Sequence, residues 1–273
     1  MNNISISRIL KLIKFEFLMH RRFYLMIFIG AFVLVTSYLT YSLSHYKIDM
    51  TQYGMKNHFY TGPYFFYMMA VLIFVAGQSF MDLRSKAGAE RYILLPASVF
   101  EKLISQGFVK FGVTFLVMPV IFVLSALLAR WIAVEHLSHW TGSIKNIEVI
   151  SSKVLFLDKD NLPLIGYVFF IGFFLFASSA LFTGSQFYGR WNSVLSPLFI
   201  MLFSLFTAFS PYLLSSLFSS KHWSVGEFLG VKREVTILGQ EAPLYIFALL
   251  VLFYLGFLLS CFISYFRLKE KEV

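Results

Sequence analysis

The chain has 273 residues, of which 58% are hydrophobic and only 14% are charged, and 34 of them are Phe. A soluble domain carries about 25% charged residues, so this composition excludes an ordinary soluble domain and predicts a membrane protein. The formal net charge of +9 suits basic loops beside an anionic inner leaflet. We expect no nucleic-acid partner, because no basic cluster with interleaved aromatics lies outside the membrane-flanking segments.

Residues 1–22 predict a basic amphipathic helix that lies in the membrane interface. Apolar residues fall at helical spacing on one face: Ile6, Ile9, Leu10, Ile13 and Phe17. Basic residues fall on another face, with three more charges beyond them: Arg8, Lys11 and Lys14, then Glu16, Arg21 and Arg22. A simple membrane-surface anchor would need no more than this pattern.

Residues 23–273 predict a helical bundle in the membrane. Six apolar runs are each long enough to cross about 30 Å of hydrocarbon as a helix. They are 23–44, 63–81, 105–129, 164–185, 194–217 and 243–266. The predicted fold is therefore all-α, a polytopic membrane protein with six transmembrane helices. In the third run Pro119 is expected to kink the helix, and Lys110 lies close enough to the interface to snorkel.

The segment 82–106 is a polar interruption between the second and third runs. Ser98-Val-Phe-Glu101 is a capping box, in which the Ser hydroxyl accepts the amide three residues on and the Glu reaches back to the Ser amide. We expect a short helix over about 84–94, a corner at Pro96, and a helix that starts near Val99 and continues into the third run. An ordinary capped connection with inside-facing charges would have the same pattern.

The distribution of Lys and Arg favours both termini inside. With that orientation thirteen of them fall in the shorter inner set of segments and nine in the longer outer set. The expected outer segments are 45–62, 130–163 and 218–242. No metal site is predicted, because the ligand-type pair His136 and His139 offers too few ligands. The single cysteine, Cys261, lies in an apolar run and is expected to be a packing residue.

Several motifs are missing from the sequence. It has no GxxxxGK[ST] nucleotide loop, no HExxH, and no pair of acidic residues in mid-membrane. We therefore predict that the chain is not itself an enzyme, holds no cofactor, and takes any energy for transport from a separate subunit.

The polar segment also resembles a known family. Arg84, Gly88, Glu90, the run 94–98, Glu101 and Lys102 are similar to the loop between the second and third spans of permeases of the type-2 (drug and polysaccharide export) ABC-transporter superfamily. The resemblance implies a coupling helix that docks on an ATPase subunit, a second permease copy (identical or a sister chain), and a bacterial cell (inner) membrane with both termini cytoplasmic. It assigns coupling to eight residues: Arg84, Lys86, Glu90, Arg91, Pro96, Ser98, Glu101 and Lys102. The cargo is not readable from the sequence.

Two other classes of function remain open. A membrane scaffold that positions partners and transports nothing would share every compositional feature. A membrane-embedded lipid-modifying enzyme is a third hypothesis, although no convergent polar constellation in the sequence supports it.

Overall fold

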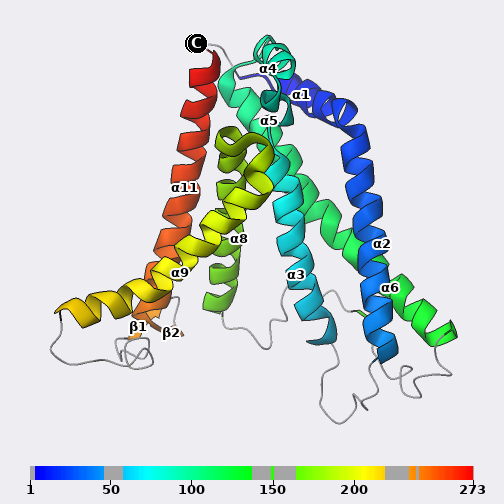
Figure 1. Ribbon diagram of the computed structural model, residues 1–273, viewed down its shortest axis with the longest axis vertical. Helices are drawn as coiled ribbons and strands as arrows, with labels where there is room; N and C mark the ends of the chain where they lie inside the picture. The colour runs from blue at the N-terminus through cyan, green and yellow to red at the C-terminus, as the bar shows by residue number, and fades with distance from the viewer. Residues whose placement is uncertain are drawn as a thin grey trace. The chain divides into compact units, whose positions relative to one another are not determined.

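Helices make up most of the described chain. The computed structural model describes residues 4–45, 58–136, 149–150, 164–218, 234–237 and 240–272 (Figure 1). Besides helices these residues form one short antiparallel ladder, in which β1 (Glu234–Ile237) pairs with β2 (Gln240–Pro243). The all-α prediction is thereby confirmed. The chain divides into two compact units, residues 1–71 with 104–159 and residues 72–103 with 160–273.

The first unit contains α1 (Ile6–Met19), α2 (Arg21–His45) and α6 (Met118–His136), with parts of α3 (His58–Val75) and α5 (Val99–Gly112). Helix α2 packs along α6, and the contact face of α6 carries small residues that let the two backbones approach. Its buried positions recur at helical spacing: Phe122, Ala126, Ala129 and Ala133.

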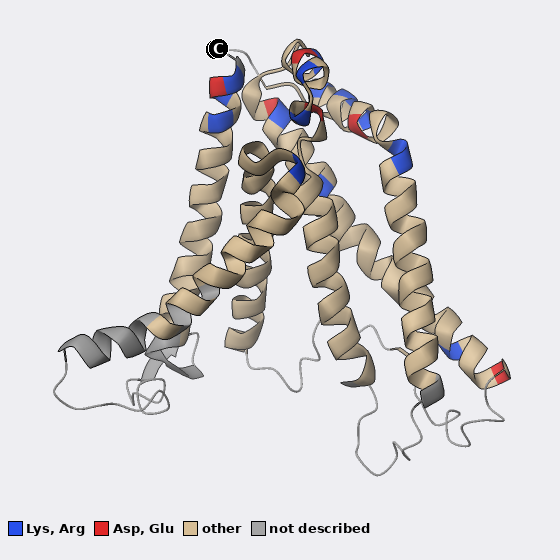
Figure 2. Ribbon diagram, viewed as in Figure 1, with Lys and Arg blue, Asp and Glu red and all other residues tan. Residues whose placement is uncertain are grey.

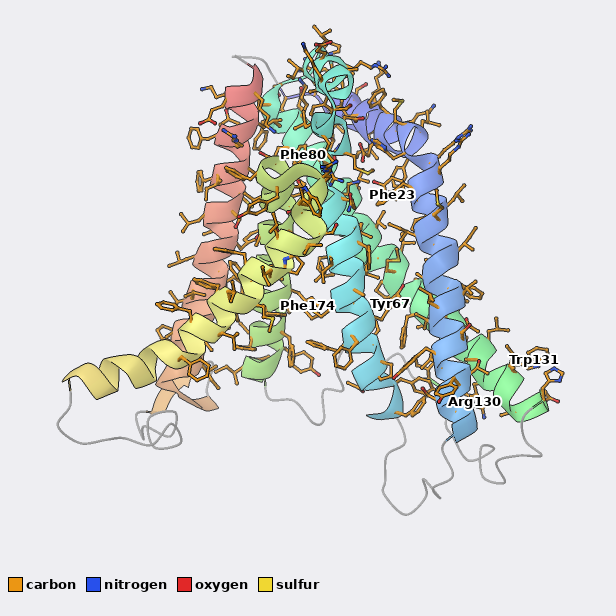
Figure 3. All side chains as sticks on the ribbon, in the orientation of Figure 1. Phe23, Tyr67, Phe80, Arg130, Trp131 and Phe174 are labelled. Carbon is orange, nitrogen blue, oxygen red and sulfur yellow. The ribbon has the colours of Figure 1, made fainter. Side chains whose placement is uncertain are left out.

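Helix α3 meets α6 through aromatic residues. Tyr64 and Tyr67 have ring centroids 5.0 and 5.4 Å from that of Phe122. The side chain of Tyr67 is labelled in Figure 3, and its hydroxyl donates to the carbonyl of Met118 at 3.0 Å. The phenol thus places its apolar ring in the bundle while its polar end is satisfied by backbone.

The third predicted run is interrupted where Pro119 was expected to act. A π-helical turn, η4 (Val113–Val117), separates α5 from α6. Proline cannot donate a backbone hydrogen bond, and its ring crowds the carbonyl four residues earlier, which here is that of Phe115. The wider π turn accommodates that missing bond one turn before the proline.

The second unit contains α4 (Lys86–Ile93), α8 (Leu164–Tyr188), α9 (Asn192–Phe218) and α11 (Leu244–Glu272). The ring of Phe253 on α11 lies 5.4 to 5.7 Å from three rings of α8, those of Phe169, Phe173 and Phe176. Further along the same pair, the Thr183 hydroxyl lies 2.8 Å from that of Ser264. Aromatic packing and several hydrogen bonds therefore join α8 to α11, among them one from the Tyr254 hydroxyl to the Val168 carbonyl at 3.2 Å.

Five stretches of the described chain are long and apolar enough to cross a membrane: Arg21–Leu43, Phe59–Gln78, Val99–His136, Leu164–Phe203 and Ile246–Lys271. The fourth predicted run and the start of the fifth fall into one of these stretches, Leu164–Phe203. They are joined by a single 3₁₀ turn, η6 (Gly189–Trp191), in which Gly189 has φ +54°, a conformation that favours glycine. The count of six spans is thus not confirmed. The expected outer segments lie largely outside the described residues.

The N-terminal helix forms as predicted, but it ends earlier. Helix α1 stops at Met19, and Arg21 and Arg22 open α2 instead of extending the amphipathic helix. The two basic residues therefore lie at the elbow between α1 and α2.

Candidate functional site

Helix α4 begins with a local cap and a close backbone approach. The Ser85 hydroxyl accepts a hydrogen bond from the Gly88 amide at 3.1 Å. A Cβ on Gly88 would lie 2.4 Å from the carbonyl oxygen of Asp82, which is shorter than any normal contact. Only glycine fits here, because the preceding 3₁₀ turn η3 (Met81–Arg84) folds directly against the helix.

One side of α4 is exposed and carries both charged and apolar side chains. Lys86, Glu90 and Arg91 are exposed, and so is Pro96 in the corner that follows. Leu94, just after the helix, is 81% exposed. We call Lys86, Glu90, Arg91 and Leu94 the α4 surface. Ionic groups around an exposed leucine suit docking to another protein, because the leucine gains by burial while the charges set specificity.

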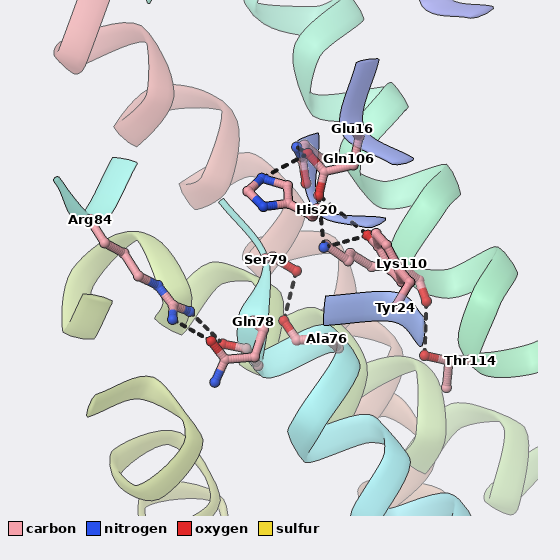
Figure 4. A network of polar contacts seen from close by, with 11 residues as sticks. Glu16, His20, Tyr24, Ala76, Gln78, Ser79, Arg84, Gln106, Lys110 and Thr114 are labelled. Atoms are coloured by element: carbon pink, nitrogen blue, oxygen red, sulfur yellow. Dashed lines mark hydrogen bonds and ion pairs between the residues drawn. The ribbon is translucent and has the colours of Figure 1, made fainter. Parts of the chain in front are cut away.

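Arg84 points into the second unit instead of joining this surface (Figure 4). Its guanidinium donates to the Gln78 side-chain oxygen and, at 3.2 Å, to the carbonyl of Gly77. Partial burial lowers the pKa of this guanidinium from its ordinary value. Arg84 therefore makes contacts within its own unit, and its contact with an ATPase subunit stays a prediction.

The backbone that Arg84 holds is also held from the start of α9. The buried Asn192 amide donates to the carbonyls of Gly77 at 2.7 Å and of Leu181 at 2.8 Å. Gln78 donates to the Ser193 hydroxyl. The chain that leads to α4 is thus tied to α8 and α9 by hydrogen bonds that are all internal to the second unit.

Phe80 is the strained point of this segment. It has φ +50°, although bulky residues rarely adopt a left-handed backbone. Its side chain is 1% exposed, with the ring 4.8 Å from that of Phe182 on α8 and 6.3 Å from that of Tyr92 on α4 (Figure 3). Burial of the ring outweighs the backbone cost. Neither the left-handed backbone nor the burial of Phe80 is predictable from the sequence, because other aromatic residues also stand at the ends of apolar runs.

The predicted capping box is confirmed. The Ser98 amide donates to a Glu101 carboxylate oxygen at 2.9 Å, and the Glu101 amide donates to the Ser98 hydroxyl at 3.3 Å. Helix α5 begins at Val99 as expected, and α4 lies within the predicted 84–94 helix. The corner is closed by reciprocal bonds that satisfy two otherwise unpaired amides.

Lys102 links the two helices across that corner. Its ammonium donates to the carbonyl of Ile93, the last residue of α4, at 3.0 Å, and lies 5.7 Å from the centroid of the Tyr92 ring. A cation at a helix C-terminus is stabilised by the carbonyls that end there. Glu101 and Lys102 are 0% and 1% exposed, so these two residues support the α4 surface from within.

A second polar cluster lies in the first unit, where α1, α2 and α5 meet (Figure 4). The Glu16 carboxylate forms an ion pair with the Lys110 ammonium at 2.9 Å and accepts from the Gln106 amide at 2.7 Å. Lys110 also donates to the Tyr24 hydroxyl at 2.7 Å, and that hydroxyl lies 3.3 Å from Glu16. Glu16 is 3% exposed and Lys110 is fully buried.

This cluster differs from the expectation for Lys110. The lysine was expected to snorkel to the interface, but its ammonium turns to Glu16 because a carboxylate from α1 lies within reach. The two residues are separated by 94 positions in the chain, so sequence spacing alone had no means to pair them.

The predicted coupling residues thus fall into two groups. Lys86, Glu90, Arg91 and Pro96 are exposed, and the others form internal contacts: Arg84, Ser98, Glu101 and Lys102. No family model matches the chain, and no curated protein or solved structure matches it. The likeness to type-2 exporter permeases therefore rests on the residues and the layout described above.

Proposed function

We propose that the chain is the membrane-spanning permease subunit of an ATP-driven exporter of the type-2 ABC class. The observation that carries this proposal is the α4 surface, an exposed charged patch on a short helix whose base is fixed by Arg84, Phe80 and Lys102. A surface of this kind can receive a push from a soluble partner without being displaced from its own unit.

The route for that push is the corner after α4. A partner that presses on α4 transmits force through the hydrogen bond from Lys102 to the Ile93 carbonyl, which joins α4 to α5, while the Ser98–Glu101 box fixes the start of α5. Helix α5 belongs to the apolar stretch Val99–His136. Since a capped helix moves as a unit, force on α4 becomes movement of that stretch.

The arrangement of charges supports the proposed orientation. In the second unit, charged residues of α4 and of the C-terminal end of α11 lie at the same end of the helices (Figure 2). Arg267, Lys269 and Lys271 at that end give the inside excess expected of a cytoplasmic terminus. Helices α8 and α9 have 25 and 27 residues, each enough for its own crossing, so we count six spans in this role.

In this role the partner is a soluble P-loop ATPase, since the sequence has no nucleotide loop, and a second permease copy completes the path. The membrane is the bacterial inner membrane. The cargo is hydrophobic or amphipathic, because the spans offer Phe and Met rather than charged groups along the path.

The experiment compares two single charge reversals at exposed residues. Arg91→Glu lies on the α4 surface, whereas Lys269→Glu lies on α11 and is not part of that surface. The tagged chain is purified from its native cells, and the co-purifying ATPase is identified and its turnover measured. We expect Arg91→Glu to lose the ATPase or its coupling while Lys269→Glu retains both. Recovery of the intact chain with no P-loop ATPase would refute the proposal and favour a membrane scaffold.

A further inference from the structure

A hollow of ≈ 670 Å³ lies at the elbow between α1 and α2. Its size is in the range of small-molecule sites. One side is polar and the other is apolar: His20, Arg21 and Arg22 line the first, and Met19, Met26 and Ile27 line the second. All of these residues belong to the first unit.

Two exposed arginines give this hollow a positive charge. Arg21 and Arg22 are exposed, and neither forms an ion pair within the part of the chain that the structure describes. Their nearest carboxylate in the sequence is Glu16, which is buried and bound to Lys110. Two guanidinium groups that line one hollow attract an anion, and a phosphate suits the planar donor geometry of arginine.

The sequence on either side of the elbow suits the headgroup level of a membrane. Helix α1 exposes apolar residues beside its basic ones, with Ile6 75% and Leu10 60% exposed, which suits the membrane interface. Helix α2 opens the apolar stretch Arg21–Leu43. If α2 crosses the membrane, the chain enters the hydrocarbon after Arg21, which would bring the polar side of the hollow to headgroups and the apolar side to acyl chains.

The methionines on the apolar side of the hollow are exposed. Met26 is 69% exposed and Met19 is 48% exposed. Methionine adapts its shape to irregular apolar partners, as an acyl chain would be. A free phosphate ion would leave this side uncovered.

The elbow is also held in shape. Tyr24, in the first turn of α2, donates to Glu16 on α1 at 3.3 Å, and its ring lies 4.9 Å from that of Phe17 (Figure 4). Lys110 binds both Glu16 and Tyr24 from α5. The angle between α1 and α2 is therefore set by buried contacts before any ligand binds, which reduces the entropic cost of binding.

We propose that this hollow binds one anionic phospholipid, with its phosphate on Arg21 and Arg22 and an acyl chain along Met19 and Met26. The site discriminates against zwitterionic lipids, because a choline group would bring a positive charge beside two arginines. The proposal is independent of the coupling role of α4.

The test uses the purified full-length chain in a nonionic detergent, where no charged membrane surface contributes. Phosphatidylglycerol and phosphatidylcholine with the same acyl chains, and glycerol phosphate alone, are each titrated, and bound lipid is counted by native mass spectrometry. The variant Arg21→Gln/Arg22→Gln is compared with Lys11→Gln/Lys14→Gln, which removes two exposed charges of α1 away from the hollow.

We expect one phosphatidylglycerol per chain, held in preference to phosphatidylcholine, and glycerol phosphate bound more weakly. The arginine pair variant should bind it about tenfold or more weakly, since two charge-assisted contacts are lost, and the lysine pair variant should bind it as the native chain does. Equal loss in both variants, equal binding of phosphatidylcholine, or equal binding of glycerol phosphate would overturn the proposal.

A second measurement does not depend on the arginine variants. A fluorophore on Ile29→Cys, an exposed position of α2 outside the hollow lining, in a Cys261→Ser background reports the acyl chain through quenching by phosphatidylglycerol with brominated chains. We expect saturable quenching at one lipid per chain. Quenching that rises without saturation, or that is equal with brominated phosphatidylcholine, would count against the site.

Discussion

The Glu16–Lys110 pair gives the sharpest test of the structure. The ammonium and carboxylate lie 2.9 Å apart, with side chains 0% and 4% exposed. Replacing either residue with Met leaves the other charge buried without this partner. We expect each single substitution to lower the free energy of unfolding by about 3–5 kcal/mol, because an uncompensated buried charge is costly.

The double substitution Glu16→Met/Lys110→Met should cost far less than the sum of the two. It removes both charges and keeps apolar volume, so the main loss is the hydrogen bonds that Glu16 accepts from Gln106 and Tyr24. Those bonds are worth about 1–3 kcal/mol together. The coupling energy between the two positions is then at least about 2 kcal/mol.

The assay is denaturant unfolding of the full-length chain in detergent, followed through a double-mutant cycle. Arg267 and Glu270 provide the matched control, because their pair lies 2.7 Å apart but its side chains are 40% and 63% exposed. Breaking that pair should cost at most about 1 kcal/mol. Single substitutions at Glu16 and Lys110 that each cost under about 1 kcal/mol and add together would refute the buried pair.

Three further substitutions probe the α4 segment. Ser98→Ala should cost about 1 kcal/mol through loss of the cap, measured by thermal unfolding; no change would mean that the cap adds no stability. Gly88→Ala should speed amide hydrogen exchange in α4, because its Cβ would meet the Asp82 carbonyl at 2.4 Å, whereas Gly62→Ala, with nothing within 4 Å, should not. Phe80→Ala should cost about 3–5 kcal/mol by emptying a buried ring site, and a loss below about 1 kcal/mol would contradict that packing.

The α4 segment shows how far sequence reasoning reaches at the candidate site. The cap at Ser98 and the start of α5 at Val99 were predictable, since a capping box closes within four residues. The orientation of Arg84 was not, because its acceptors, the Gln78 side chain and the Gly77 carbonyl, are brought within reach only by the fold of the chain after α3. A polar residue beside an apolar run looks the same in sequence whether it faces solvent or the protein.

The local sequence pattern by itself determined the helical class of this protein and its long apolar stretches. Composition and the length of the apolar runs were sufficient for a helical bundle with stretches able to cross a membrane, and helical spacing was sufficient for the amphipathic α1. These properties depend on residues within one or two turns of each other. The chain sequence carries them directly.

Only the tertiary structure decided which charges are buried and what they meet. Lys110 pairs with a carboxylate 94 residues away, and Arg84 turns inward while Arg91, in the same segment, stays exposed. The reason is physical: a charge enters a low-dielectric interior only where a partner offsets its desolvation, and that partner is brought by the packing of whole helices.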